Sequence, residues 1–149
     1  MIHKQLQYIQ EYLPFINKKQ VNISKATVGW HLDHMLKVIN AVFEGVKNSN
    51  PKEYKKQFNG LRLLFFTMGF FPRGKARAPK RVMPPVIILK EEIERQLKLA
   101  IQNIATINDI ADNQYFTHPL FKQLNKKQTL YFLKLHTHHH LKIVKEILR

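Results

Sequence analysis

The chain has 149 residues, a formal net charge of +15 at pH 7 and no cysteine. The length suits a single domain over residues 1–149 with a sizeable core, and the lack of cysteine excludes disulfides, thiolate metal sites and a cysteine nucleophile. The longest apolar stretch, 61–71, is interrupted by polar residues and falls far short of the roughly 20 residues that span a bilayer. We therefore expect a cytoplasmic protein with no membrane partner.

The positive charge favours contact with anionic partners. However, the lysines are spread over every segment, often as the polar stripe of an amphipathic helix. The sequence also contains no recognisable nucleic-acid-binding motif. A solvated surface therefore explains the charge better than nucleic-acid binding does.

Hydrophobic periodicity predicts five helical segments, and we find no convincing strand alternation. The first covers about 2–17, where Pro14 predicts a kink or an early end. The second begins after Ser24, a good N-cap residue, and runs to about residue 47. The stop signal Asn-Ser-Asn-Pro follows it at 48–51.

A shorter helical segment covers 51–70, and prolines prevent a regular helix from residue 71 to residue 85. This long loop carries five basic residues that can attract an anionic substrate, namely Arg73, Lys75, Arg77, Lys80 and Arg81. The fourth helix is expected over 89–111. The fifth begins after Asn125, where Gln128 completes a capping-box pattern, and it runs to the C-terminus.

These elements predict an all-α four-helix bundle. Residues 51–88 then form an elaborated crossover with a short extra helix between the second and fourth segments. A crossover of that length lets the two flanking helices lie parallel, which disfavours a simple up-down-up-down order.

Histidines on the last helix divide between two faces. On a helical wheel, His136 and His140 share the core-facing arc with Leu133, whereas His138 and His139 fall outside it. Two imidazoles at i and i+4 are spaced to bind one metal ion. The alternative is a pair of core histidines whose hydrogen bonds are satisfied by serine, threonine or backbone groups.

The second helix offers a third ligand. His34 shares a face with Trp30, while His31 lies about 60° away as a substitute ligand. Asp33 and Glu44 fall on the polar side of this helix. Three protein nitrogens leave a coordination position for water or substrate, which is typical of catalytic rather than structural sites.

Three motifs resemble the DinB-like superfamily, in particular a bacterial branch of unknown function. They are Leu-Asp-His at 32–34, His-Pro-Leu-Phe at 118–121 and His-Thr-His-His-His-Leu at 136–141. The resemblance implies an up-down-down-up four-helix bundle. It also implies a divalent metal, often zinc or nickel, held by His34, His136 and His140. The chain departs from the branch pattern at Lys122, where that pattern has glycine, and at residues 142–143.

Some members of the superfamily resemble thiol-dependent transferases or isomerases. We therefore expect a metal-dependent enzyme, a transferase or small hydrolase, with a small-molecule substrate such as a low-molecular-weight thiol. The surrounding pocket is expected to include Trp30, His31, His118 and His139. His118 has the alternative role of a loop anchor.

Two alternatives stay open from the sequence. The first is a non-catalytic, stress-related or regulatory binding module whose basic surface meets nucleic acid or an acidic partner. The second concerns the apolar cluster at 61–71, which offers more apolar surface than a crossover needs. That cluster either packs against the bundle or is buried in a homodimer.

Overall fold

The computed structural model describes residues 2–74 and 79–149, so the basic residues Lys75 and Arg77 lie outside the described part. The helices are α1 (Ile2–Glu11), α2 (Val28–Lys47), α3 (Gly60–Met68), α4 (Lys90–Ala105) and α5 (Lys126–Ile147). Two short strands, β1 (Tyr115–His118) and β2 (Lys122–Asn125), precede α5. Four single turns of 3₁₀ helix are Leu13–Phe15, Pro51–Glu53, Lys80–Val82 (η3) and Ile107–Asp109.

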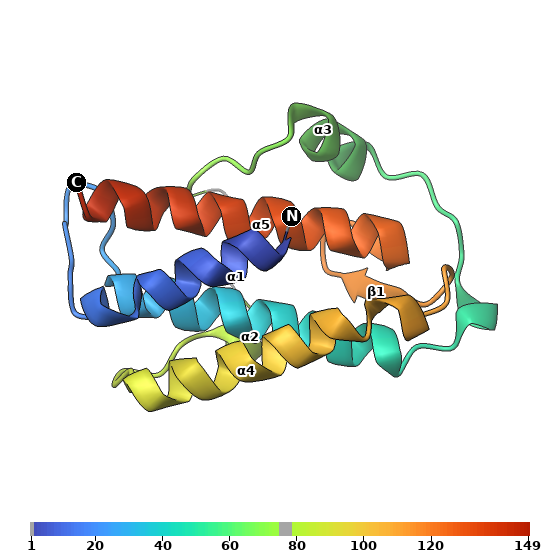
Figure 1. Ribbon diagram of the computed structural model, residues 1–149. Coiled ribbons are helices and arrows are strands. Elements are labelled where there is room, and N and C mark those ends of the chain that lie inside the picture. Colours follow the sequence, from blue (N-terminus) through green and yellow to red (C-terminus); the bar gives the residue numbers. More distant parts are fainter. Residues whose placement is uncertain (1, 75–78) are drawn as a thin grey trace.

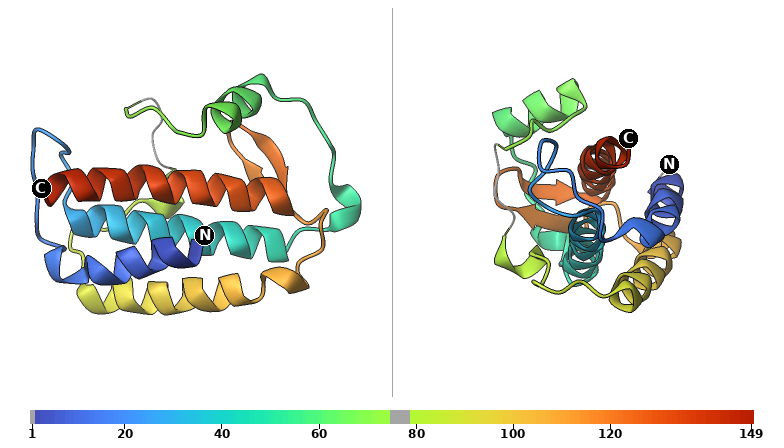
Figure 2. Two further views of the ribbon diagram at one scale, coloured as in Figure 1. Left: turned by 45° about the horizontal axis from the view of Figure 1, so that its top comes forward. Right: turned by 90° about the vertical axis from the view of Figure 1, so that its left-hand side faces the viewer.

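Four helices form a bundle in which α1 and α2 each contact both α4 and α5. In Figure 1, α2 and α4 run in one direction and α1 and α5 in the other. The end-on view of Figure 2 shows α3 and the strands outside these four helices. The mainly helical bundle predicted from periodicity is therefore confirmed. The parallel pair α2 and α4 is joined by the long crossover that contains α3.

The apolar core runs along the axis of the bundle. Ile9 of α1, Leu32 and Ile39 of α2, Ile93 of α4 and Leu133 of α5 are completely buried. Each such side chain stabilises the fold by roughly 1.5–3 kcal/mol relative to an exposed one. Among the described residues, no helix is both long and apolar enough to cross a membrane.

The start of α2 is fixed by a side-chain cap and by a close backbone approach. The N-cap is Thr27, whose Oγ1 accepts a hydrogen bond from the Trp30 N–H at 3.2 Å, so the prediction of Ser24 was wrong. The Gly29 N–H donates to the Ile16 carbonyl at 2.8 Å. A Cβ at Gly29 would lie only 3.0 Å from that oxygen, so the chain before α2 packs where a side chain would otherwise be.

The start of α5 is capped as predicted, because the capping box of Asn125 and Gln128 is present.

Three helices are shorter than the periodicity predicted. α1 ends at Glu11, and Pro14 lies in the 3₁₀ turn that follows. The Thr106 hydroxyl donates to the Asn103 carbonyl at 2.9 Å, and α4 ends before it at Ala105 rather than at 111. In the crossover, α3 begins only after Asn59, which caps it. Local side-chain hydrogen bonds end helices that an apolar stripe alone would continue.

The hairpin β1–β2 corrects the prediction of a purely helical fold. The strands are antiparallel, with Tyr115 opposite Asn125 and His118 opposite Lys122. β1 packs against α2 at Gly45, where an added Cβ would lie 3.2 Å from the Phe116 ring. Each strand has four residues, which is too short for alternation to be distinguished from irregular chain.

The turn of this hairpin carries an unusual backbone conformation. Lys122 has φ of +60°, a left-handed conformation that glycine adopts more readily. His118, expected in a loop, is the last residue of β1, and its Nδ1 accepts hydrogen bonds from the Leu120 and Phe121 N–H groups. The sequence pattern that this chain resembles has glycine at the position of Lys122, and the positive φ gives a physical reason for glycine there.

The apolar cluster at 61–71 is divided in the structure. Phe65, Phe66 and Phe71 pack against the core, whereas several neighbours are exposed, namely Leu61, Leu63, Leu64, Met68 and Phe70. No residue of α3 is fully buried. The cluster therefore packs partly against the bundle, and the homodimer stays a prediction.

Replacing Lys122 with glycine should stabilise the protein. Removing the Cβ relieves the left-handed conformation, and we expect the free energy of unfolding to rise by about 1 kcal/mol. Urea unfolding at pH 7 would measure the change. Lys122→Ala is the matched control, because it removes the same charge but keeps the Cβ. Equal stability of the two variants would contradict the explanation.

Candidate metal centre

Three histidines from two helices converge between α2 and α5. His34 lies on α2, and His136 and His140 lie one turn apart on α5. One ring nitrogen of each lies within 4.8 Å of the other two. Ring centroids are 5.1 Å apart for His34 and His136, 4.8 Å for His34 and His140, and 4.7 Å for His136 and His140. The predicted convergence of these residues is confirmed.

A metal ion would need only a small contraction of this cluster. Nitrogens bound tetrahedrally to zinc at about 2.0–2.1 Å lie about 3.4 Å from one another. None of the three nitrogens is more than 4.8 Å from another, so the side chains would have to move only slightly closer together to share an ion.

Hydrogen bonding at Nδ1 of His34 leaves its other ring nitrogen, Nε2, free to bind a metal. Its Nδ1 lies 2.8 Å from the Val82 carbonyl oxygen, and a carbonyl can only accept, so Nδ1 carries the proton. The remaining nitrogen, Nε2, then has a lone pair for a metal. This hydrogen bond holds η3 against α2.

A chain of three side chains orients His140. The Nδ1 atoms of His140 and His31 lie 3.0 Å apart, and the Nε2 of His31 lies 3.0 Å from the Ser24 Oγ. If His140 binds a metal through Nε2, its Nδ1–H donates to His31, and the Nε2–H of His31 donates to Ser24. Both imidazole protons in this chain then have an acceptor. His31, the substitute ligand in the sequence prediction, is instead the hydrogen-bond partner of His140.

His136 supplies the third ring. Among the described residues its Nδ1 is buried and has no hydrogen-bond partner. A buried imidazole nitrogen without a partner is unfavourable by about 1–3 kcal/mol, and a metal ion in the cluster would provide an explanation for its presence. The donor set therefore fits a divalent ion that accepts neutral imidazoles, such as zinc or nickel.

Burial keeps these imidazoles neutral. It lowers the pKa of His34, and it lowers the pKa values of His136 and His140 well below the usual value of 6.5. The positive charge that each neighbouring histidine would carry adds to the effect on His136 and His140. Neutral rings are the form that binds metal, so at pH 7 no proton has to be removed first.

Aromatic rings surround the three histidines. The Trp30 ring stacks on His34 at 5.1 Å and 24°, and the Phe132 ring lies 5.7 Å from His136. The His139 ring lies 5.1 Å from His140, and burial lowers the pKa of His139. Trp30 and His139 are thus beside the centre, where the sequence analysis expected a pocket.

The described basic residues of the loop at 71–85 do not form one cluster. Arg73 pairs with Glu146 of α5 at 2.8 Å, and its charge contributes to lowering the pKa values of His31 and His139. Arg81 pairs instead with Glu44 of α2, and Lys80 is exposed. Of the two paired arginines, Arg73 is the one whose charge reaches the histidines.

His118 is an anchor of the hairpin turn and is not one of the three clustered histidines. Its ring stacks on Phe121 at 4.4 Å and meets the Phe132 edge at 4.7 Å, and Phe132 in turn contacts His136. Burial lowers the pKa of His118 to about 4, so its Nδ1 stays available as an acceptor.

Asp33 was assigned to the polar side of the second helix, but it is buried at 1% exposure. Its Oδ1 accepts a hydrogen bond from Gln96 of α4 at 2.7 Å, and Lys37 pairs with its Oδ2 at 2.8 Å. α4 packs on this side of α2, which the wheel of a single helix does not reveal. Glu44 is exposed, as predicted.

Two contributors to the centre escaped the sequence analysis. The Val82 carbonyl lies 48 positions from His34, and no sequence signal marks a backbone acceptor. Ser24 attracted notice only as a helix cap. A serine shortly before a helix that carries histidines is too common a pattern to identify a hydrogen-bond partner.

The comparisons with known proteins identify one family. The family model of the DinB superfamily matches residues 15–144, a span that includes all three histidines of the cluster. No curated protein and no solved structure matches the chain significantly.

Removing the Ser24 hydroxyl should weaken metal binding. Ser24→Ala leaves the Nε2–H of His31 without its acceptor and loosens the orientation of His140, so we expect zinc affinity to fall by about tenfold. Competition with a chromophoric chelator would measure the affinity. Ser24→Thr keeps the hydroxyl and should restore binding. Wild-type affinity in the alanine variant would show that His140 does not depend on this chain of hydrogen bonds.

His118 should make the protein sensitive to acid. Because its pKa is near 6.5 unfolded and about 4 folded, the unfolded state binds more protons between these pH values. Its stabilisation is complete above pH 6.5 and falls as the pH drops toward 4, by at most about 3 kcal/mol.

The variant His118→Asn tests this effect. The asparagine Oδ1 can accept the same two backbone hydrogen bonds but does not titrate between pH 4 and 7. Urea unfolding from pH 7 to 4 should therefore show a shallower loss of stability than in the wild type. An identical pH profile would exclude His118 as the cause.

Proposed function

Since the chain belongs to the DinB superfamily, we propose that it is a divalent-metal-dependent enzyme whose ion is held by His34, His136 and His140. The ion is zinc or nickel, because three neutral imidazoles suit both. A metal in this position would supply Lewis acidity and lower the pKa of a coordinated water or thiol.

The observation that carries the proposal is the proton arrangement around the three rings. The Nδ1 of His34 donates to the Val82 carbonyl, and the Nδ1 of His31, 3.0 Å from the Nδ1 of His140, can accept the proton of His140. His34 thus has a free lone pair on Nε2, and His140 has one there whenever His31 accepts its Nδ1 proton. A nitrogen of His136 is also buried without a partner among the described residues. A pair of core histidines satisfied by protein groups alone, which is the competing explanation, leaves that nitrogen unexplained.

The reaction that this centre favours is transfer from, or hydrolysis of, a small molecule. Three protein ligands leave room for one more group, and a low-molecular-weight thiol is a suitable substrate because the chain has no cysteine of its own. Trp30 would cover one side of the substrate. Arg73 is placed to attract an anionic group, since its charge already acts on His31 and His139.

Metal content and fluorescence test the proposal together. Untagged wild-type protein should carry about one zinc or nickel ion per chain by plasma mass spectrometry. Trp30 is the only tryptophan and stacks on His34, so nickel binding should quench its fluorescence. His34→Ala and His136→Ala should abolish both signals.

His138→Ala is the matched control, because His138 lies exposed on the same helix. It should leave metal content and quenching unchanged. Absence of bound metal in the wild type, even after zinc and nickel are added, would overturn the proposal. The non-catalytic binding module with a basic surface would then be the better explanation.

A further inference from the structure

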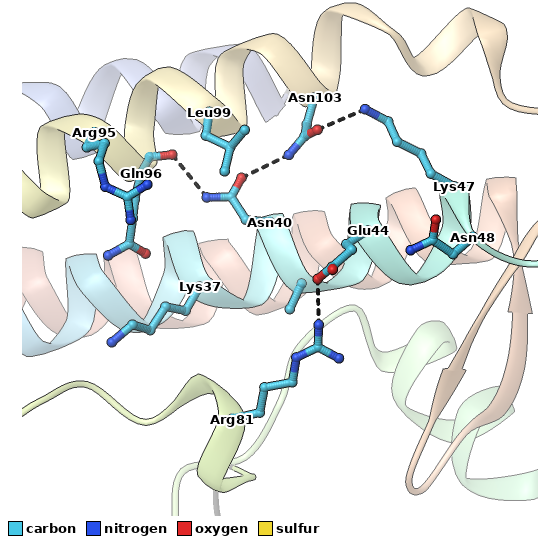
Figure 3. Close-up of a pocket in the computed structure, with 11 residues that line it drawn as sticks. Lys37, Asn40, Glu44, Lys47, Asn48, Arg81, Arg95, Gln96, Leu99 and Asn103 are labelled. Carbon is cyan, nitrogen blue, oxygen red and sulfur yellow. Dashed lines mark hydrogen bonds and ion pairs between the residues drawn. The ribbon is translucent and has the colours of Figure 1, made fainter.

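A second concave site lies between α2 and α4, away from the three histidines. It has a volume of about 550 Å³, and Figure 3 shows side chains of both helices and Arg81 of η3 converging on it. None of His34, His136 and His140 lines it. We call this space the α2–α4 groove.

Among the described residues, four cations from three elements line the groove. Lys37 and Lys47 come from α2, Arg95 from α4 and Arg81 from η3. The one carboxylate in the described part of this lining belongs to Glu44. The chain as a whole adds a long-range field, because its net charge is +15. Both features favour an anionic ligand.

The ion pair between Arg81 and Glu44 is weak enough to be exchanged, whereas Lys37 stays paired with the buried Asp33 at 2.8 Å. In the pair of Arg81 and Glu44, the side chains are 69% and 60% exposed, and pairs of that exposure contribute roughly 0–1 kcal/mol. Arg95 instead holds Glu92 through two hydrogen bonds, at 2.8 and 2.7 Å, so a ligand would bind the remaining N–H groups of its guanidinium. Lys47 donates to the neutral Asn103 Oδ1 at 2.9 Å, so that bond leaves its charge uncompensated. A phosphate can therefore replace Glu44 as the partner of Arg81 and gain bidentate hydrogen bonds.

Carboxamides give the groove a second kind of recognition. The Asn103 Nδ2 donates to the Asn40 Oδ1, and the Asn40 Nδ2 donates to the Gln96 carbonyl, both at 3.1 Å. Asn48 also lines the groove, and Ala41 and Leu99 add small apolar patches. Amides of this kind exchange hydrogen bonds with hydroxyl groups. No aromatic side chain is among the described lining residues, so a nucleobase would have no ring on which to stack.

We propose that the α2–α4 groove binds a small phosphorylated polyol of the sugar-phosphate class. Arg81 and Arg95 hold the phosphate, Lys47 adds positive charge, and Asn40, Asn48 and Asn103 contact the hydroxyl groups. The site goes beyond the metal-dependent function and does not depend on it, because it shares no ligand with the histidine cluster. Glu44 competes with the phosphate for Arg81.

Calorimetric titration of the full chain with ribose 5-phosphate tests the proposal. Arg81→Gln and Arg95→Gln should each weaken binding by about tenfold, since each removes a charge-assisted hydrogen bond. Glu44→Gln should tighten binding by about threefold, because it removes the competing carboxylate at an exposed position. These variants change exposed side chains, and circular dichroism would verify their fold.

Lys98→Gln is the matched control, because Lys98 lies on the exposed face of α4 and does not line the groove. Its binding should stay within about twofold of the wild type. Three results would each overturn the proposal: no heat of binding at millimolar ribose 5-phosphate, equal weakening by Lys98→Gln and Arg81→Gln, or tighter binding of AMP or inorganic phosphate than of ribose 5-phosphate. These readouts are independent of metal loading, so a failure here leaves the metal proposal unaffected.

Discussion

The centre of this molecule depends on keeping three buried imidazoles uncharged. Rings packed between α2 and α5 cannot easily hold a positive charge, and burial lowers the pKa of each of them. A neutral imidazole has one donor and one acceptor nitrogen. Each ring therefore needs a hydrogen-bond acceptor for its N–H and a donor or a metal ion for its lone pair. The Val82 carbonyl accepts the proton of His34, and His31 stands beside His140. One ring nitrogen of each histidine lies within 4.8 Å of the other two, and the Val82 hydrogen bond leaves Nε2 of His34 free.

The sequence predicts those parts of the structure that follow from one helix at a time. The three-to-four spacing of apolar residues indicates the main helices. The wheel of the last helix separates His136 and His140 from the exposed His138, as the structure confirms. Spacing succeeds here because both histidines belong to the same helix and their relative position is fixed by its geometry.

Features that depend on how two elements meet were not predictable in the same way. Asp33 is polar and lies off the apolar stripe, yet α4 buries it and supplies Gln96 as its partner. The hairpin at Tyr115–Asn125 is too short to show a period, and the packing of Phe116 on Gly45 of α2 is a contact between distant parts of the chain. The roles of Ser24 and Val82 depend on loop paths that no local pattern encodes.

The short segment around η3 connects two chemically different sides of α2. Val82 accepts a hydrogen bond from His34, and the neighbouring Met83 carbonyl accepts one from Lys37 at 3.3 Å. Arg81, the residue before Val82, faces the α2–α4 groove. Three consecutive residues therefore contact the centre and the groove through bonds to a single helix. A displacement of this segment would be transmitted to both sites through direct contacts.

The positions of the three histidines in the chain have a consequence for folding. His34 precedes His136 by about a hundred residues, so an ion shared between α2 and α5 would close a loop containing most of the protein. Such a tether acts as a cross-link. For a loop of about 100 residues, chain-entropy estimates for a covalent link give about 4–5 kcal/mol, and an exchangeable ion can contribute part of this. The pair on α5 can capture an ion locally, but the tether forms only once α2 has docked. Detachment of the last helix would then require a ligand bond to break as well as apolar contacts.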